Sequence, residues 1–335
     1  MLGRGGLLAI TLGGALLGGA AACHTTIHDD DAVDAGRDAA TSPSDPVEAG
    51  APDAARPEPP LLPATSGTTA ALRAVWIAAD ASIAVAVGDG GTIVSSKDGG
   101  RSWVPATSGV TEDLLGVWGA SAAEVWVCGK NGTVLRSSDG AAWSKVTTFG
   151  AATTVVGVWG SSADQVFFLG ANGKSYRTRD HGQTFEGFQA PNGLAMVGIS
   201  GTSAKDLWAV AASNMFHSTD DGETFTAVST NLAQTRGIWA GGPEDVYTVN
   251  ELSVVTRFDG KALYKNALQG PKLTAVWGSA PNDVYVVGEQ ALVRHSIDRN
   301  SRWASVAGAS GDLHGVGGNQ TTVLVVGAGG GIFRR

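Results

Sequence analysis

The chain has little of several residue types, and each shortage excludes a class of protein. It has two cysteines in 335 residues, too few for a disulfide framework. Lysine and arginine number 23 against 31 aspartates and glutamates, so no basic field can attract nucleic acid. Charged residues make up 16% of the chain, whereas glycine reaches 48 residues. This composition is typical of short strands joined by tight turns.

Long hydrophobic runs are also missing, apart from a short one at the start. Residues 1–22 contain Arg4 and then the glycine-rich stretch LLAITLGGALLGGAAA, the pattern of a secretory signal peptide. The stretch is too short to favour a permanent membrane span. It ends in AAAC at residues 20–23, which resembles a bacterial lipobox with Ala20 in place of the usual leucine. Cleavage there would leave Cys23 as an acylated first residue; the alternative is secretion after cleavage near Ala22.

Residues 23–59 contain almost no large apolar side chain. Between His24 and Pro60, nine acidic residues stand against Arg37 and Arg56. Such a segment cannot bury enough surface to offset the entropy lost on ordering. Like charges extend it and prolines stiffen it. We therefore expect a disordered Asp/Ala/Pro-rich tether that holds a folded domain, residues 60–335, near a membrane that only the lipid anchor touches.

The rest of the chain repeats the phrase L-x-x-V-W-G-S with variations. The copies are separated by 42, 41, 40, 40, 38 and 40 residues and centre on Trp76, Trp118, Trp159, Ile199, Trp239, Trp277 and Gly317. Turn sequences such as Asn131-Gly132 supply the positive φ angles of tight hairpins. Repeats of about 40 residues with four short strands are the signature of a β-propeller. The seven copies predict an all-β, seven-bladed propeller of four-stranded antiparallel blades.

The two ends of the repeat array complement each other. The seventh copy stops at Arg335 after three strands. Residues 62–67 (LPATSG) match residues 104–109 (VPATSG), which belong to a fourth strand, at five of six positions. We therefore predict that the N-terminal strand completes the last blade and closes the ring, which removes the open sheet edges.

A second motif, S/T-x-D-x-G-x-T-W/F, stands between the third and fourth strands. Its clearest copy is STDDGETF at residues 218–225. The carboxylate is expected to accept backbone N–H groups of its turn, and the aromatic residue is expected to pack on the blade. We interpret the aspartates of this motif as structural: Asp98, Asp139, Asp180 and Asp220.

Together the two motifs resemble the Asp-box (BNR) repeat β-propeller family over residues 60–335. The chain is most similar to propellers of the photosystem II assembly-factor type and to myxobacterial propeller lipoproteins, which have Asp-rich tethers. Sialidases of this family carry an arginine triad and a Tyr–Glu pair. Here Tyr247 and Tyr285 occupy a packing position of the second strand, and no such arginine set recurs. The resemblance implies the fold and leaves the function open.

The predicted function is a membrane-tethered, extracytoplasmic, non-catalytic scaffold that binds or assembles proteins. The alternatives are a carbohydrate-binding propeller and a divergent Asp-box glycoside hydrolase, which needs two carboxylates. Glu251 and Glu289 are the candidates for that pair. All ten tryptophans are expected in the core, so they do not favour sugar stacking. The polar turns between second and third strands supply the candidate binding residues: Lys130, Asn131, Asn172, Asn214, Asn250 and Gln290.

Metal and cofactor chemistry is not expected. The histidines of the repeats lack ligand spacing, and no helix follows the glycine-rich residues 327–331. The expected partner is a protein of the cell envelope or a glycan, bound by a monomer. The expected location is a bacterial lipoprotein on the outer or inner membrane, with secretion as the alternative.

Overall fold

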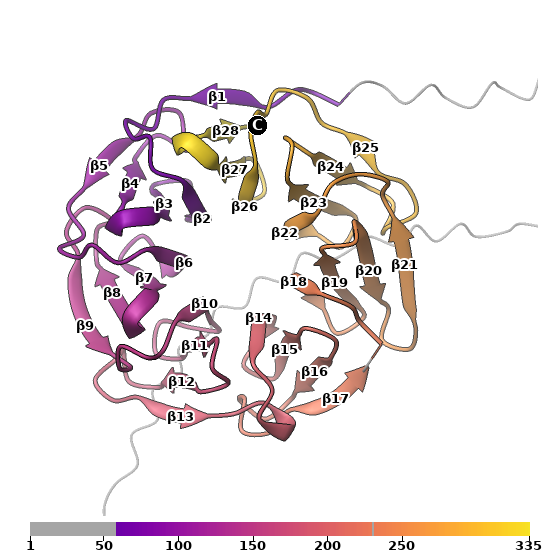
Figure 1. Cartoon of the computed structure of the whole chain (residues 1–335), viewed down its shortest axis with the longest axis horizontal. Coiled ribbons are helices and arrows are strands. Elements are labelled where there is room, and N and C mark those ends of the chain that lie inside the picture. Colours follow the sequence, from indigo (N-terminus) through magenta and orange to yellow (C-terminus); the bar gives the residue numbers. More distant parts are fainter. Residues whose placement is uncertain (1–57, 230) are drawn as a thin grey trace, which may run out of the picture. The chain divides into compact units, whose positions relative to one another are not determined.

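The computed structural model describes residues 58–229 and 231–335, which form seven four-stranded antiparallel sheets around a central axis (Figure 1). Each sheet is one blade, with its first strand at the axis and its fourth at the rim. This arrangement confirms the predicted seven-bladed propeller. The predicted signal peptide, Cys23 and the tether lie outside the described residues, except for its last two residues, Glu58 and Pro59.

The first four blades follow the chain. Blade 1 is β2 (Leu72–Ile77), β3 (Ala84–Gly88), β4 (Ile93–Ser96) and β5 (Val104–Ala106), and blade 2 is β6 (Leu114–Ser121), β7 (Glu124–Gly129), β8 (Thr133–Ser137) and β9 (Ser144–Thr148). Blade 3 is β10 (Val155–Gly160), β11 (Val166–Gly170), β12 (Ser175–Thr178) and β13 (Glu186–Phe188). Blade 4 is β14 (Met196–Ser203), β15 (Asp206–Ala211), β16 (Met215–Ser218) and β17 (Thr226–Ser229).

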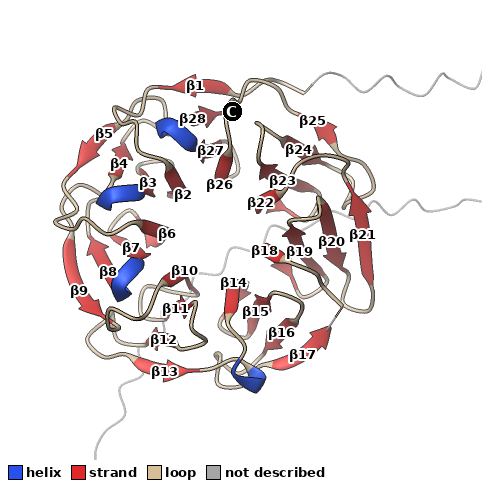
Figure 2. Ribbon diagram, in the orientation of Figure 1, coloured by secondary structure: helices blue, strands red, loops and turns tan. Residues whose placement is uncertain are grey.

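The last three blades continue around the ring. Blade 5 is β18 (Thr235–Gly242), β19 (Asp245–Asn250), β20 (Val254–Phe258) and β21 (Leu263–Ala267), and blade 6 is β22 (Leu273–Ala280), β23 (Asp283–Gly288), β24 (Val293–Ser296) and β25 (Ala304–Ser305). Blade 7 combines β26 (Leu313–Gly318), β27 (Val323–Gly327) and β28 (Ile332–Arg334) with β1 (Leu62–Ala64). Helix in the described part is confined to the single turns η1 (Asp89–Gly91), η2 (Lys130–Gly132), η3 (Pro191–Gly193) and η4 (Ala328–Gly330) (Figure 2). None of the described helices is long and apolar enough to cross a membrane.

The ring closes where the sequence predicts. In Figure 1 the N-terminal strand β1 lies beside the C-terminal strand β28, with Leu62 opposite Arg334 and Ala64 opposite Ile332. An ion pair of 2.6 Å joins Glu58 to Arg335, the last residue of the chain. Blade 7 therefore depends on both ends of the described chain.

The core lies between the blades. The second strands are buried on both faces, because alternate side chains face the preceding and the following blade. In β3, Ala86 packs in one cluster with Leu324 of blade 7, while Val87 packs in another with Leu114 of blade 2. Cys128 in β7 is fully buried, and burial raises the pKa of its thiol.

Each first-strand tryptophan lies over a glycine of the next blade. A Cβ atom built on the facing glycine would lie within 3.2 Å of the indole in all five cases: Trp76 over Gly119, Trp118 over Gly160, Trp159 over Gly201, Trp239 over Gly278 and Trp277 over Gly318. In blade 4 the register places the tryptophan position at Ser200 and not at Ile199, on which the fourth repeat was centred, and Ser200 faces Ala240. In blade 7 the position is Gly317, and the facing position of blade 1 is Ile77. Where the tryptophan is missing, the facing glycine is missing too.

The expectation that all ten tryptophans lie in the core is wrong for these five, and Trp143 and Trp303 are only half-buried as well. Trp103, Trp126 and Trp208 are buried, but the first-strand tryptophans are only half-buried. The first strand borders the axis, so no further strand covers its side chains on the inner side. The indoles therefore remain partly accessible near one opening of the ring.

In four blades an acidic side chain, an aromatic ring and a basic side chain contact one another, an arrangement that we call the clamp. In blade 4 the Asp206 carboxylate accepts from the Trp208 indole N–H at 2.8 Å and lies 2.9 Å from His217 Nε2, while the imidazole stacks on the indole. In blade 6, hydrogen bonding to His295 lowers the pKa of Asp283. This clamp was not predicted from the sequence, although its members recur at fixed repeat positions: Glu124–Trp126–Arg136, Asp206–Trp208–His217, Asp245–Tyr247–Arg257 and Asp283–Tyr285–His295.

Candidate functional site

The ring has two faces with different loops. We call the face with the turns between second and third strands and the blade-to-blade loops the top face. The face with the turns between first and second and between third and fourth strands is the bottom face. On the top face, neighbouring blades are joined directly, since Gly132 N–H donates to Thr153 O at 2.5 Å and the Asp113 carboxylate accepts from Gly90 N–H at 2.9 Å.

The predicted binding residues all lie in second-to-third-strand turns of the top face, but most serve their own turns. Asn250 is buried, and its Oδ1 accepts the N–H groups of Leu252 and Val254. Asn172 accepts from Lys174 N–H and donates to Thr153. Lys130 pairs with Asp113 at 2.6 Å, which lowers the pKa of that carboxyl. The remaining three hold the turn: Asn131 and Gln290 have φ near +53°, and Asn214 Oδ1 accepts from Ser213.

The two candidate catalytic carboxylates also lie on the top face, in neighbouring blades. Glu251 forms an ion pair with Arg236 and lies 3.9 Å from Lys272. Glu289 is half-buried, and its backbone N–H donates to Lys272 O at 3.0 Å. A general acid of a glycosidase needs a raised pKa. Glu251 instead faces two cationic side chains, Arg236 and Lys272.

The Asp-box aspartates lie far from the axis, in turns of the bottom face. Asp220 accepts from Thr224 N–H at 2.9 Å and from the hydroxyls of Thr224 and Ser218, and these bonds lower its pKa to about 2. Asp180 makes the equivalent bonds to Thr184 and Thr178, and its pKa is also lowered to about 2. Asp98 and Asp139 bind their turns in the same way. These contacts are the ones that a structural role requires.

A hollow opens near the axis on the bottom face, where the sequence analysis placed no site. Its volume is about 300 Å³, and we call it the axial hollow. Trp277 of blade 6 and Trp76 of blade 1 line it, and blade 7, which has Gly317 at the tryptophan position, contributes Gly318, Asn319 and Gln320 between them. Nine further residues complete it: Ile77, Ala79, Gly119, Ala120, Gly278, Ser279, Gly318, Asn319 and Gln320.

Of the polar side chains that line the axial hollow, Asn319 and Ser279 are hydrogen-bonded within the chain, whereas no such bond is found for Gln320 among the described residues. Asn319 Nδ2 donates to Ala78 O at 3.1 Å, and its Oδ1 accepts from Thr321 and Thr322. Ser279 Oγ donates to Asp283. None of the residues that line this hollow carries a carboxylate, an imidazole, an amine or a thiol. The hollow therefore offers aromatic and aliphatic surface rather than reactive groups.

Comparison with solved structures identifies proteins of the same fold. No protein-family model and no curated protein matches the chain. Among solved structures, "YCF48 bound to D1 peptide" has a TM-score of 0.70 at 16% identity, covering 83% of this chain and 97% of that one. The chain has the β-propeller fold. YCF48 from Cyanidioschyzon merolae follows with a TM-score of 0.69, 15% identity and coverage of 82% and 98%. Streptogramin B lyase has 0.70, 13% identity and coverage of 82% and 96%, so the shared property of these neighbours is the propeller itself.

Within the described residues, no group of three or more His, Cys, Asp or Glu side chains is placed to hold a metal ion. The sequence did contain a signal for the axial hollow. Gly317 breaks the tryptophan series and Ile77 breaks the facing glycine series. Only the closed ring makes these two breaks neighbours.

Proposed function

We propose that this propeller is a non-catalytic scaffold that binds a protein segment outside the cytoplasm, tethered to a membrane through Cys23. The axial hollow is the proposed contact site. We also retain, as part of the proposal, a relationship to the Asp-box repeat propellers, since four turns carry the motif and its hydrogen bonds. The protein acts on its partner by holding it, and no step of bond making is proposed.

The carrying observation is the pair of half-buried indoles, Trp76 of blade 1 and Trp277 of blade 6, on either side of blade 7 in the lining of the axial hollow. Aromatic side chains on a rigid frame supply large contact area at little entropic cost. An apolar side chain of a partner needs only such walls, whereas a sugar also needs several free hydrogen-bonding groups. Asn319 and Ser279 are already engaged within the chain. This balance favours a protein segment.

The comparisons support the same class. One propeller of similar structure was solved with a peptide, at 16% identity to this chain. A sequence identity this low supports a shared fold and does not support a shared binding partner. The neighbour therefore supports peptide binding as a use of this architecture, and the residues of the axial hollow carry the rest of the proposal.

Carbohydrate binding is the second candidate, because indole faces stack well on sugars. We test it with purified full-length protein on a broad glycan array, beside a Trp277→Ala variant. We expect no glycan whose retention depends on Trp277. Trp159→Ala is the matched control, since Trp159 is a first-strand tryptophan outside the axial hollow. Selective retention by wild type and Trp159→Ala, lost in Trp277→Ala, would move the protein to the carbohydrate-binding class.

The membrane anchor has its own test. If Cys23 is acylated, labelled palmitate fed to cells should enter the wild-type protein and not a Cys23→Ala variant. The acyl chains are the only membrane contact in this proposal, so the variant should also leave the membrane fraction. Equal labelling of the two proteins would remove the anchor and leave secretion as the location.

A further inference from the structure

The contact between blades 4 and 5 contains polar residues where the other blades are apolar. Thr235 opens β18 at a position that is leucine, valine or methionine in the other six blades: Leu72, Leu114, Val155, Met196, Leu273 and Leu313. Thr248 in β19 occupies a position that is apolar in the same six blades: Ala86, Val127, Phe168, Ala209, Val286 and Val325. Thr256 in β20 lies directly opposite Thr248. Three buried hydroxyls thus gather at one of the seven interfaces.

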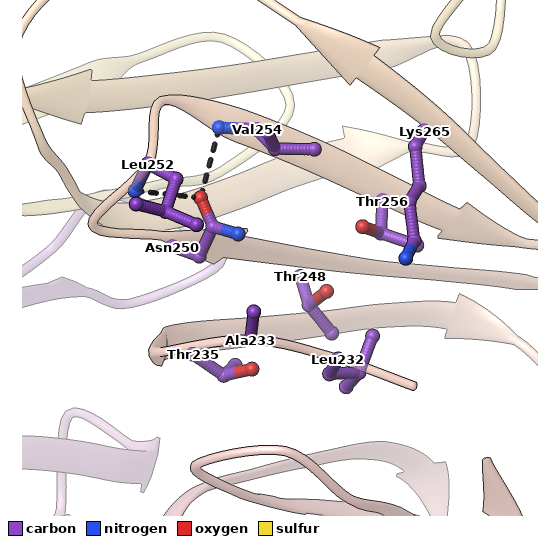
Figure 3. A pocket seen from close by; sticks show the side chains of 9 residues that line it. All are labelled: Leu232, Ala233, Thr235, Thr248, Asn250, Leu252, Val254, Thr256 and Lys265. Atoms are coloured by element: carbon purple, nitrogen blue, oxygen red, sulfur yellow. Dashed lines mark hydrogen bonds between the residues drawn. The ribbon is translucent and has the colours of Figure 1, made fainter. Parts of the chain in front are cut away.

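These threonines line a cavity of about 130 Å³, which we call the seam cavity (Figure 3). Thr235, Thr248 and Thr256 are 4%, 3% and 3% exposed. Within the described residues none of the three hydroxyls makes a hydrogen bond, and their oxygens are open to the cavity. Leu232 and Ala233, from the loop that joins blade 4 to blade 5, form one wall, and Leu252 lies at the opening. Buried hydroxyls without partners cost free energy unless something in the cavity bonds to them.

The polar groups of the seam cavity are biased toward donors. Asn250 is 8% exposed. Its Oδ1 accepts the backbone N–H of Leu252 and the backbone N–H of Val254, so only its Nδ2 is left to bond a ligand. Lys265 also lines the cavity and spends one donor on Asn231 O at 2.9 Å. An ammonium group carries three donors, so two remain. No acidic side chain is among the lining residues. A positive charge and several donors without a counter-charge match an anion.

We propose that the seam cavity binds a small carboxylate, with the carboxylate oxygens held by Lys265, Asn250 Nδ2 and the threonine hydroxyls. The apolar end of the acid lies against Leu232, Val254 and Leu252. The volume corresponds to about four water molecules, which suits a short-chain acid or the last residue of a peptide. Both sources present the same carboxylate chemistry. The seam cavity shares no residue with the axial hollow, so each proposal can fail without the other.

The probe is propionate, with propionamide as its neutral isostere, titrated into the isotopically labelled full-length protein. The backbone amide signals of Leu252 and Val254 report ligand binding at Asn250 directly, because both N–H groups donate to its Oδ1. We expect saturable shifts with propionate and none with propionamide. A Thr248→Val/Thr256→Val variant, which installs residues found in other blades, should bind about tenfold more weakly or worse. Thr133→Val is the matched control, since Thr133 is a buried threonine of blade 2 and should leave binding unchanged.

Two further arms complete the test. A short peptide with a free C-terminal carboxylate is compared with its amidated form, and tighter binding of the free peptide than of propionate identifies a chain end as the ligand. Lys265→Met should weaken both acids. The amide shifts could instead depend on ionic strength alone, without saturation and equally for propionate and chloride. That result would mean that the cavity holds only water, and it would overturn the proposal. Equal binding by wild type and the Thr248→Val/Thr256→Val variant would overturn it as well.

Discussion

Leu61→Ala is expected to lower the free energy of unfolding by about 2–5 kcal/mol, because it truncates a buried leucine where the ring closes. Leu61 immediately precedes the closing strand β1 and is only 2% exposed. Its side chain belongs to the cluster of Val293, Val306 and Phe333, which joins blades 6 and 7. The substitution removes apolar contacts from this cluster and leaves a cavity between the two blades. Urea denaturation followed by tryptophan fluorescence measures the change.

The neighbouring residue provides the control. Leu62 is 64% exposed, so Leu62→Ala should change the free energy of unfolding by no more than about 0.5 kcal/mol. The two variants delete the same atoms one residue apart. Similar losses in both would contradict the assignment of Leu61 to the closure and would mean that the N-terminal strand is not docked as described.

Gly160→Ala is expected to lower the free energy of unfolding by about 1–3 kcal/mol through overpacking. A Cβ atom on Gly160 would lie 2.5 Å from the Trp118 ring and 2.8 Å from Gln165 O. The indole belongs to blade 2 and the carbonyl to blade 3, so the added methyl group pushes neighbouring blades apart. Thermal unfolding should show a lower midpoint.

Gly157 lies in the same strand, β10, and tests whether the effect is steric. Its Cβ atom would meet nothing closer than Leu169 Cδ1 at 3.7 Å, an ordinary contact. Gly157→Ala should therefore be neutral or slightly stabilising, because alanine reduces the conformational freedom of the unfolded chain. An equal loss in both variants would point to a general need for glycine in first strands rather than to a tryptophan–glycine contact.

Sequence periodicity predicted the architecture because each blade is a local unit. The seven phrases, the Asn-Gly and Asp-Gly turns and the match between residues 62–67 and 104–109 all concern contacts within one sheet or its direct continuation. The blades form as predicted, and β1 joins β28. Such features follow from spacing alone.

The candidate sites were harder to predict because they form between blades. The axial hollow needs Trp277, Gly317 and Trp76, and the last of these lies 241 positions before Gly317. The seam cavity needs a comparison of Thr235 and Thr248 with the same positions in all other repeats. Turn polarity, by contrast, directed attention to Asn172 and Asn250, whose side-chain oxygens accept backbone N–H groups of their own turns. A polar turn residue indicates a turn before it indicates a ligand.

Site-specific photocrosslinking in the cells that produce the protein tests the central claim most directly. A photoreactive amino acid at Ala120, an exposed residue of the axial hollow, is compared with one at Ser138, an exposed residue of the outer Asp-box turn of the same blade. We predict a discrete crosslinked protein from position 120 that is absent from position 138 and is lost when Trp277→Ala is added. If position 120 crosslinks to no protein, or if its product persists in the Trp277→Ala background, the axial hollow is not a protein-binding site.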